Sequence, residues 1–171
     1  MSIIVKEIKN LNPQELDECL SISKNLFGKK YHSKKYFSNE NLLKLIAVKK
    51  NTVIGFFMVR QKSQNILIDC IGIRKKWQRK KVGSLLMEYF FKNIVKSDHK
   101  VVVYAWKVDN LIPIHRLNLK FGMKKIKNLG MIWKEKCNHS FKCIQFEKSC
   151  NCECVLYLSL IHISEPTRLA E

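Results

Sequence analysis

No apolar run in this chain of 171 residues approaches the roughly 20 residues that a membrane-spanning helix needs. The N-terminus, MSIIVKEIKN, carries charges where a secretory signal peptide has its apolar stretch. No internal repeat or low-complexity linker interrupts the sequence. We therefore expect one soluble cytoplasmic domain, long enough to bury a core and without a membrane partner.

Acidic residues are also scarce, because 14 Asp and Glu stand against 32 Lys and Arg, for a net charge of +18. This excess favours a polyanionic partner such as nucleic acid or a phosphorylated ligand. Only five of the basic residues are Arg, and Lys is ordinarily a solvated surface residue, so the total alone discriminates little. The local concentration is more informative: six of the eight residues from Arg74 to Lys81 are cationic.

Hydrophobic residues make up 46% of the chain and nine are Phe, which favours a globular core over a disordered chain. Near the N-terminus, Asn12 precedes Pro13 and Glu15, a pattern that predicts a capping box and a helix start. Gly28 is the expected end of this helix. A second, short helix is expected near Asn41.

Short apolar segments rich in β-branched and aromatic residues predict strands, and their short polar connections favour an antiparallel meander. The strands are expected at residues 3–8, 45–50, 52–60, 65–73 and 100–106, with two or three more between 124 and 157. The clearest amphipathic helix is predicted from Val82 to Phe90. Another is predicted between Pro113 and Gly122.

The basic run lies directly before the helix predicted at Val82. A helix start presents unpaired backbone N–H groups and a partial positive charge, so it attracts phosphate. Gly83 and Ser84 are small, which leaves that approach uncluttered. The pattern predicts a phosphorylated cofactor. A solvated basic loop is the alternative, but it would not by itself require small residues at the helix entry.

The stretch IGIRKKWQRKKVGSLLM resembles the central motif of the GCN5-related N-acetyltransferases (GNAT), a Q/R-x-x-G-x-G/A loop between a strand and a helix. Gln78, Val82 and Gly83 fall on the motif, whereas Lys81 replaces its first glycine. The order of elements resembles the family over residues 1–157. The resemblance implies a single α/β (α+β) domain there: a mixed, mostly antiparallel sheet of six to seven strands flanked by about four helices.

The same resemblance implies acetyl-CoA as the cofactor. Backbone groups of Ile71, Gly72 and Ile73 would lie along its pantetheine arm, and Asn110 would contact the same part of the cofactor. The residues implied to cradle the pyrophosphate are Arg79, Lys80, Lys81, Val82, Gly83 and Ser84. If Lys81 must adopt the positive φ of the missing glycine, the cost is about 1–2 kcal/mol.

Two further residues are candidates for catalysis by that resemblance. Asp69 falls where many relatives carry an acid that serves as base, and strand alternation places it on the face of Ile71 and Ile73. Anchoring the acceptor amine, or a structural pairing with a lysine, are alternatives for Asp69. Asn118 falls where the family has the tyrosine that protonates the leaving thiolate; an amide can hydrogen-bond sulfur but cannot supply a proton in that way.

The implied function is N-acetyl transfer from acetyl-CoA to a primary amine, by direct attack in a ternary complex. The acceptor stays open among polyamine, aminoglycoside, amino acid and protein N-terminus. The alternative is a catalytically degraded module of the same fold that binds RNA, the ribosome or another acidic partner, which Lys81, Asn118 and the net charge favour. A homodimer formed through sheet edges is common among proteins that the chain resembles.

Seven cysteines, an odd number in a chain without a secretion signal, do not indicate a disulfide framework. Five of them lie between residues 137 and 154. Thiolates from Cys137, Cys143, Cys150 and Cys152 could close a structural zinc site, although the spacing lacks paired CxxC knuckles. Plain burial of the thiols is the alternative.

The C-terminal stretch from Leu158 to Arg168, LSLIHISEPTR, resembles a translated sequencing-library adapter. On that resemblance residues 158–171 are expected to be a non-native tail outside the fold.

Overall fold

The computed structural model describes residues 2–137, 139, 141–146 and 150–159. A seven-stranded sheet has the order β1-β3-β4-β5-β6-β9-β7, and a separate two-stranded sheet pairs β2 with β8. The strands of the main sheet are β1 (Ile4–Ile8), β3 (Leu42–Lys49), β4 (Thr52–Lys62), β5 (Asn65–Ile73), β6 (Lys100–Lys107), β7 (Met123–Gly130) and β9 (Glu153–Ser159). The small sheet joins β2 (Gly28–Lys29) and β8 (Lys142–Cys143).

In the described part of the chain, four α-helices and one 3-10 helix accompany the strands. They are α1 (Pro13–Phe27), α2 (Lys34–Phe37), η1 (Lys75–Trp77), α3 (Val82–Asn93) and α4 (His115–Lys120). Every neighbouring pair in the main sheet is antiparallel except β5 and β6, which run parallel. The expected mixed, mostly antiparallel sheet with about four helices is confirmed.

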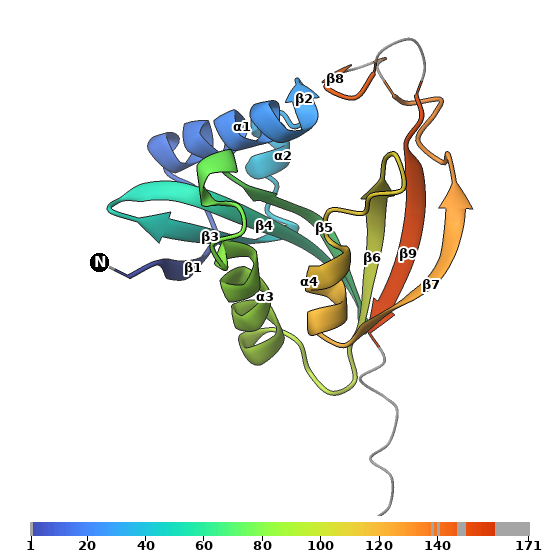
Figure 1. Cartoon of the computed structure of the whole chain (residues 1–171). Coiled ribbons are helices and arrows are strands. Elements are labelled where there is room, and N and C mark those ends of the chain that lie inside the picture. The colour runs from blue at the N-terminus through green and yellow to red at the C-terminus, as the bar shows by residue number, and fades with distance from the viewer. Residues whose placement is uncertain (1, 138, 140, 147–149, 160–171) are drawn as a thin grey trace, which may run out of the picture.

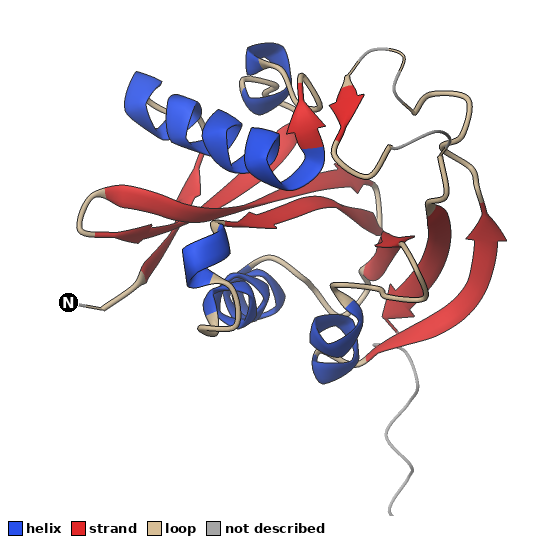
Figure 2. Ribbon diagram, turned by 45° about the horizontal axis from the view of Figure 1, so that its top comes forward, coloured by secondary structure: helices blue, strands red, loops and turns tan. Residues whose placement is uncertain are grey.

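The helices cover both faces of the sheet (Figure 1). Helices α1 and α2 lie over one face, and α3 and α4 lie over the other, which Figure 2 shows from a second direction. Successive residues of β4 serve the two cores: Phe56 packs with Cys19 and Phe37 beneath α1 and α2, whereas Phe57 packs with Phe90 of α3. This two-sided burial explains why the segment is apolar without alternation.

The start of α1 agrees with its sequence pattern. Asn12 caps the helix through Glu15 N–H at 2.9 Å, and the Glu15 carboxylate accepts from Asn12 N–H at 3.0 Å. The second helix, however, lies at Lys34–Phe37 rather than near Asn41, because the Ser33 hydroxyl caps the N–H of Tyr36. Among the described residues no helix is long and apolar enough to span a bilayer.

The end of β9 extends past the boundary expected at Tyr157. Ser159 is buried, and its Oγ accepts a hydrogen bond of 2.9 Å from Val101 N–H. Leu158 pairs with Val102 of β6 and with Lys124 of β7. The rest of the expected tail, residues 160–171, lies outside the described residues.

Candidate functional site

The main sheet divides between β5 and β6. These strands pair only from Asn65–Ile68 to Lys100–Val103, after which β5 continues on β4 and β6 continues on β9. Figure 1 shows the two halves of the sheet diverging beyond that pairing. Within the described residues, the facing edges of the diverging segments have no strand partner, so their backbone groups are open to another hydrogen-bonding molecule.

A β-bulge in β5 coincides with this divergence. Met58 pairs with Cys70 and Val59 pairs with Ile68, which leaves Asp69 as the extra residue of the bulged strand. A bulge interrupts the alternation of side chains, so the residues on either side of it change face. Bulges of this kind often re-aim a side chain beside an active site.

The bulge makes one sequence-based prediction wrong. Ile71 and Ile73 pack against the core beneath α3, as does Ile68 on the other side of the bulge. Asp69 instead contacts Tyr36 of α2, on the opposite face of the sheet. Asp69 therefore does not share a face with Ile71 and Ile73, because simple alternation does not hold across the inserted residue.

The Asp69 carboxylate is held by two donors. The hydroxyl of Tyr36 donates to Oδ2 at 2.5 Å, and Arg60 donates from Nε to Oδ1 at 2.8 Å and from Nη2 to Oδ2 at 3.4 Å. The expected structural partner was a lysine; the structure shows an arginine. Tyr36 and Arg60 were not identified from sequence, because neither is near Asp69 in the chain. The register of β4 against β5 brings Arg60 to Asp69, and the packing of α2 on the sheet brings Tyr36 there.

An aromatic group adjoins this carboxylate. The rings of His32 and Tyr36 stack with centroids 4.0 Å apart and planes inclined by 10°. His32 Nδ1 and Ser23 Oγ are hydrogen-bonded at 2.9 Å. Burial lowers the pKa of His32 to about 4, against the opposing effect of the Asp69 charge, so this imidazole is neutral at neutral pH.

On the other face, the start of α3 has the features of an anion site. Lys81 is its N-cap residue, with a left-handed φ of 63°, and no side chain caps the helix among the described residues. The N–H of Leu85 makes the helical bond to Lys81 C=O, at 3.0 Å. The earlier N–H groups, of Val82, Gly83 and Ser84, precede that bond and are free of helical partners by the geometry of a helix start.

Gly83 also has a packing role that the sequence did not reveal. A Cβ placed on Gly83 would lie 3.3 Å from Leu117 Cδ2 and 3.8 Å from Ile71 Cδ1. The glycine therefore lets α3 approach α4 and β5 closely. Similarly, a Cβ on Gly72 would lie 2.6 Å from Cζ of Phe56, so that glycine makes room for a core ring.

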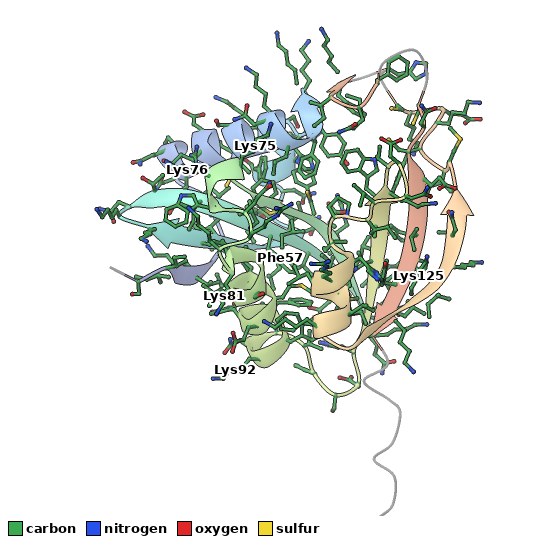
Figure 3. The ribbon with its side chains drawn as sticks, in the orientation of Figure 1. Phe57, Lys75, Lys76, Lys81, Lys92 and Lys125 are labelled. Atoms are coloured by element: carbon green, nitrogen blue, oxygen red, sulfur yellow. The ribbon has the colours of Figure 1, made fainter. Side chains whose placement is uncertain are left out.

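The basic run does not converge on one point. Arg74 turns to the other face, where its Nε donates to Val53 C=O at 2.7 Å. Lys75 and Lys76 lie on η1 and, with Arg74, line a cavity of about 520 Å³ against α1. Figure 3 shows Lys75 and Lys76 near α1 and Lys81 beside α3. Only Arg79 to Lys81 directly precede the start of α3, so these are the cations of the run that could contribute to binding a phosphate at that helix start.

Asn118 of α4 is fully buried, and neither its Oδ1 nor its Nδ2 has a hydrogen-bond partner in the described part of the chain. A buried amide without partners is costly and indicates a missing ligand or solvent group. Asn118 therefore lies in the interior of the protein, and its proposed role in catalysis stays a prediction. Asn110 is exposed in the turn before α4, which begins at His115, and its φ is 64°; its contact with the pantetheine arm stays a prediction.

The cysteine-rich segment forms a small cluster of its own. Cys137, Cys150 and Cys152 are buried together, and Cys143 packs at their margin with Trp106. Burial raises the pKa of Cys137 to about 12 and that of Cys152 to about 11, so both stay protonated at neutral pH. All seven cysteines are free thiols.

The structure does not support the zinc expectation for Cys137, Cys143, Cys150 and Cys152. Among the described residues, no group of three or more His, Cys, Asp or Glu side chains is placed to hold a metal ion. Packing of protonated thiols against aromatic rings accounts for the cluster as ordinary apolar burial.

Comparison with known proteins adds to this geometry. Residues 11–123 match the family model described as the acetyltransferase (GNAT) family. A solved aminoglycoside 6'-N-acetyltransferase complexed with coenzyme A is similar in structure, with a TM-score of 0.73 and 13% identity over 95% of this chain and 99% of that one. No curated protein sequence matches the chain significantly.

Two further solved structures are similar. The ribosomal-protein-S18-alanine N-acetyltransferase from Escherichia coli has a TM-score of 0.70 and 12% identity over 99% of this chain and 100% of its own. Arabidopsis thaliana NAA60, in complex with a bisubstrate analogue, has a TM-score of 0.66 and 13% identity over 92% of this chain and 97% of its own. At these identities the likeness shows the fold alone.

Proposed function

The chain belongs to the acetyltransferase (GNAT) family, and on that premise we propose that it transfers an acetyl group from acetyl-CoA to a primary amine. The observation that carries the proposal is the fully buried amide of Asn118, which has no partner among the described residues. Asn118 lies close to the diverging part of β5, because its neighbour Leu117 packs in the same core as Ile71. A ligand entering there would satisfy the amide.

The residues present fit the proposed cofactor. The N–H groups of Val82, Gly83 and Ser84 at the uncapped start of α3 would bind its pyrophosphate, with Arg79 to Lys81 adding positive charge. The open edge of β5 from Ile71 to Ile73 would hydrogen-bond the pantetheine amides. When bound, acetyl-CoA supplies the acetyl group as a thioester.

In this proposal Asp69 and Asn118 act from opposite faces of the sheet. Asp69 projects to the face of α2, so it would hold the incoming amine on that side and accept its proton, directly or through water. Tyr36 and Arg60 fix the carboxylate in one position. Asn118, on the face of α3 and α4, would donate from Nδ2 toward the departing sulfur.

This arrangement brings the two substrates from opposite faces of the sheet. Asp69 contacts α2, whereas α3 starts on the other face. Both substrates can then be bound at once, as direct transfer in a ternary complex requires. No covalent intermediate on the protein is needed, and the thiols of Cys137, Cys150 and Cys152, which pack in a core of their own, take no part in this route.

Release of free CoA thiol from acetyl-CoA, measured with and without a panel of primary amines, tests the proposal. We expect amine-dependent release, together with a product heavier by one acetyl group in a mass spectrum. Asp69→Asn should lower kcat/KM by about 100-fold, within the range for loss of a general base, while Lys92→Gln on the far end of α3 should leave it unchanged. Release that no amine increases would contradict the proposal, and salt-sensitive RNA binding without acetyl-CoA binding would favour the nucleic-acid alternative.

A further inference from the structure

On the α2 face of the sheet, the Asp69 carboxylate is already paired with a cation. Arg60 Nε lies 2.8 Å from Asp69 Oδ1. The Arg60 side chain is 46% exposed and the Asp69 side chain only 19%, so an approaching molecule meets the guanidinium more readily than the carboxylate. The pair therefore presents positive rather than negative charge.

Exposed lysines flank that pair. Lys34 and Lys35 are exposed in the single turn of α2 that carries Tyr36, the other partner of Asp69. Lys29 of β2 stands opposite Lys142 of β8, and both are exposed. Residues 28–44 contain five lysines and one acid, so little negative charge offsets them.

Aromatic contacts join these cationic elements into one surface. The ring of Tyr31, two residues after β2, lies 4.9 Å from that of Phe141, directly before β8, in an edge-to-face contact. The Tyr31 ring also lies 4.6 Å from His32, which stacks on Tyr36. The small sheet and α2 are thus neighbours on the side of Asp69, and we call this surface, formed by residues 28–36, Arg60 and 141–143, the acceptor face.

We propose that the amine acceptor is carried on an anionic molecule, with carboxylate or phosphate groups close to the reacting amine. This inference rests on the acetyl transfer proposed above and names the substrate class for it. A polycation such as a polyamine or an aminoglycoside would meet like charge on every element of the acceptor face, whereas an anion would be attracted and oriented. The likeness to an aminoglycoside acetyltransferase concerns the fold and does not carry this choice.

Arg60 is suited to be the direct contact. A guanidinium has five N–H donors, and two of its nitrogens already bond Asp69. Its remaining donors, on the exposed part of the side chain, could bind a carboxylate or phosphate of the acceptor in a charge-assisted hydrogen bond. The lysines would act at longer range, and screening limits that effect to roughly 8–10 Å at physiological ionic strength.

A matched set of acceptors tests the proposal. The first series is three short peptides with the same N-terminal residue, followed by two Asp, two Asn or two Lys residues. The second series compares glucosamine 6-phosphate with glucosamine and spermidine. At low ionic strength we expect kcat/KM for the anionic member to exceed that for its neutral counterpart at least about tenfold in one of the two series. The series that shows the effect distinguishes a peptide carboxylate from a phosphate source.

Equal rates for anionic and neutral members in both series, or the highest rate for a cation, would overturn the inference while leaving acetyl transfer intact. No acetylation of any amine, with acetyl-CoA bound, would overturn the inference and the proposed transfer together. The two failures are therefore distinguishable.

Paired variants locate the effect. Lys34→Gln/Lys35→Gln should reduce the anionic preference by about threefold or more at low salt, with little change for the neutral acceptor. Lys92→Gln/Lys125→Gln removes the same net charge from exposed positions on α3 and β7, which Figure 3 shows away from α2, and should leave the preference unchanged. An equal drop in both double variants would show that only net charge matters and would overturn the role of the acceptor face.

Discussion

The hydroxyl of Tyr36 donates a hydrogen bond of 2.5 Å to Oδ2 of Asp69, joining the short helix α2 to the bulge in β5. The two residues are 33 positions apart in sequence. This contact holds the carboxylate on the α2 face, opposite the start of α3. It is the basis for assigning one face of the sheet to the amine and the other to the cofactor.

A double-mutant cycle should measure this coupling. Tyr36→Phe and Asp69→Asn should each destabilise the fold, and the double variant should lose less than the sum, with an interaction energy of about 1–2 kcal/mol, since hydrogen bonds to a charged group are stronger than neutral ones. Urea unfolding of the four proteins gives the value. Additive losses would show that the hydroxyl does not hold the carboxylate in solution.

Asn118 gives a prediction in which stability and binding change in opposite directions. Replacing a buried amide without partners by an apolar side chain of similar size removes its desolvation cost, so Asn118→Leu should stabilise the free protein by about 1–2 kcal/mol. The same change should weaken acetyl-CoA binding, because the proposed partner of the ligand is lost. Thermal unfolding and calorimetric titration measure the two effects. Destabilisation with unchanged affinity would instead indicate a structural role.

Lys81 has a left-handed backbone that favours glycine. Its φ is 63°, which for a residue with a Cβ costs about 1–2 kcal/mol. Lys81→Gly should therefore be about 1 kcal/mol more stable than Lys81→Ala, which also lacks the ammonium group but keeps the Cβ. Denaturant midpoints of the two variants provide the comparison, and equal midpoints would mean that the strain is absent.

His32 should make the fold sensitive to acid. Burial lowers its pKa from 6.5 to about 4, so the unfolded chain binds a proton more readily than the folded one between these values. The free energy of unfolding therefore has its full value above pH 6.5. It decreases as the pH falls toward 4, by at most about 3 kcal/mol from this group.

The matched variant for that prediction is Ser23→Ala/His32→Phe. It removes the titrating ring together with the buried hydroxyl that would otherwise lose its partner. Stability measured from pH 7 to pH 4 should fall less steeply in this variant than in the parent protein. Parallel curves would assign the acid sensitivity to other groups.

Local signals in the sequence were sufficient for most of the fold. The capping box at Asn12, the apolar spacing of α3 and the strand β4 each follow from residues close together in the chain. The helix α2 was expected too late in the chain because its single turn is set by the Ser33 cap rather than by periodicity.

The site was harder to predict because its key relationships are not local. The bulge at Asp69 depends on the register of β5 against β4, and alternation along one strand cannot reveal it. Arg60 and Tyr36 reach Asp69 only through that register and the packing of α2. The cysteine spacing, by contrast, was ambiguous, and the structure favours burial because the thiols pack against Trp106 and Phe141.

Binding of acetyl-CoA at the start of α3 is the central claim, and calorimetric titration of acetyl-CoA into the parent protein and three Gly83 variants tests it most directly. Gly83→Ala measures the steric effect against Leu117, and Gly83→Asn and Gly83→Asp have nearly the same shape but differ by one negative charge. We predict micromolar binding to the parent protein and an affinity at least about tenfold weaker for Asp than for Asn, because the added carboxylate repels the pyrophosphate. Equal affinities of the Asn and Asp variants, or no binding by the parent protein, would contradict the account.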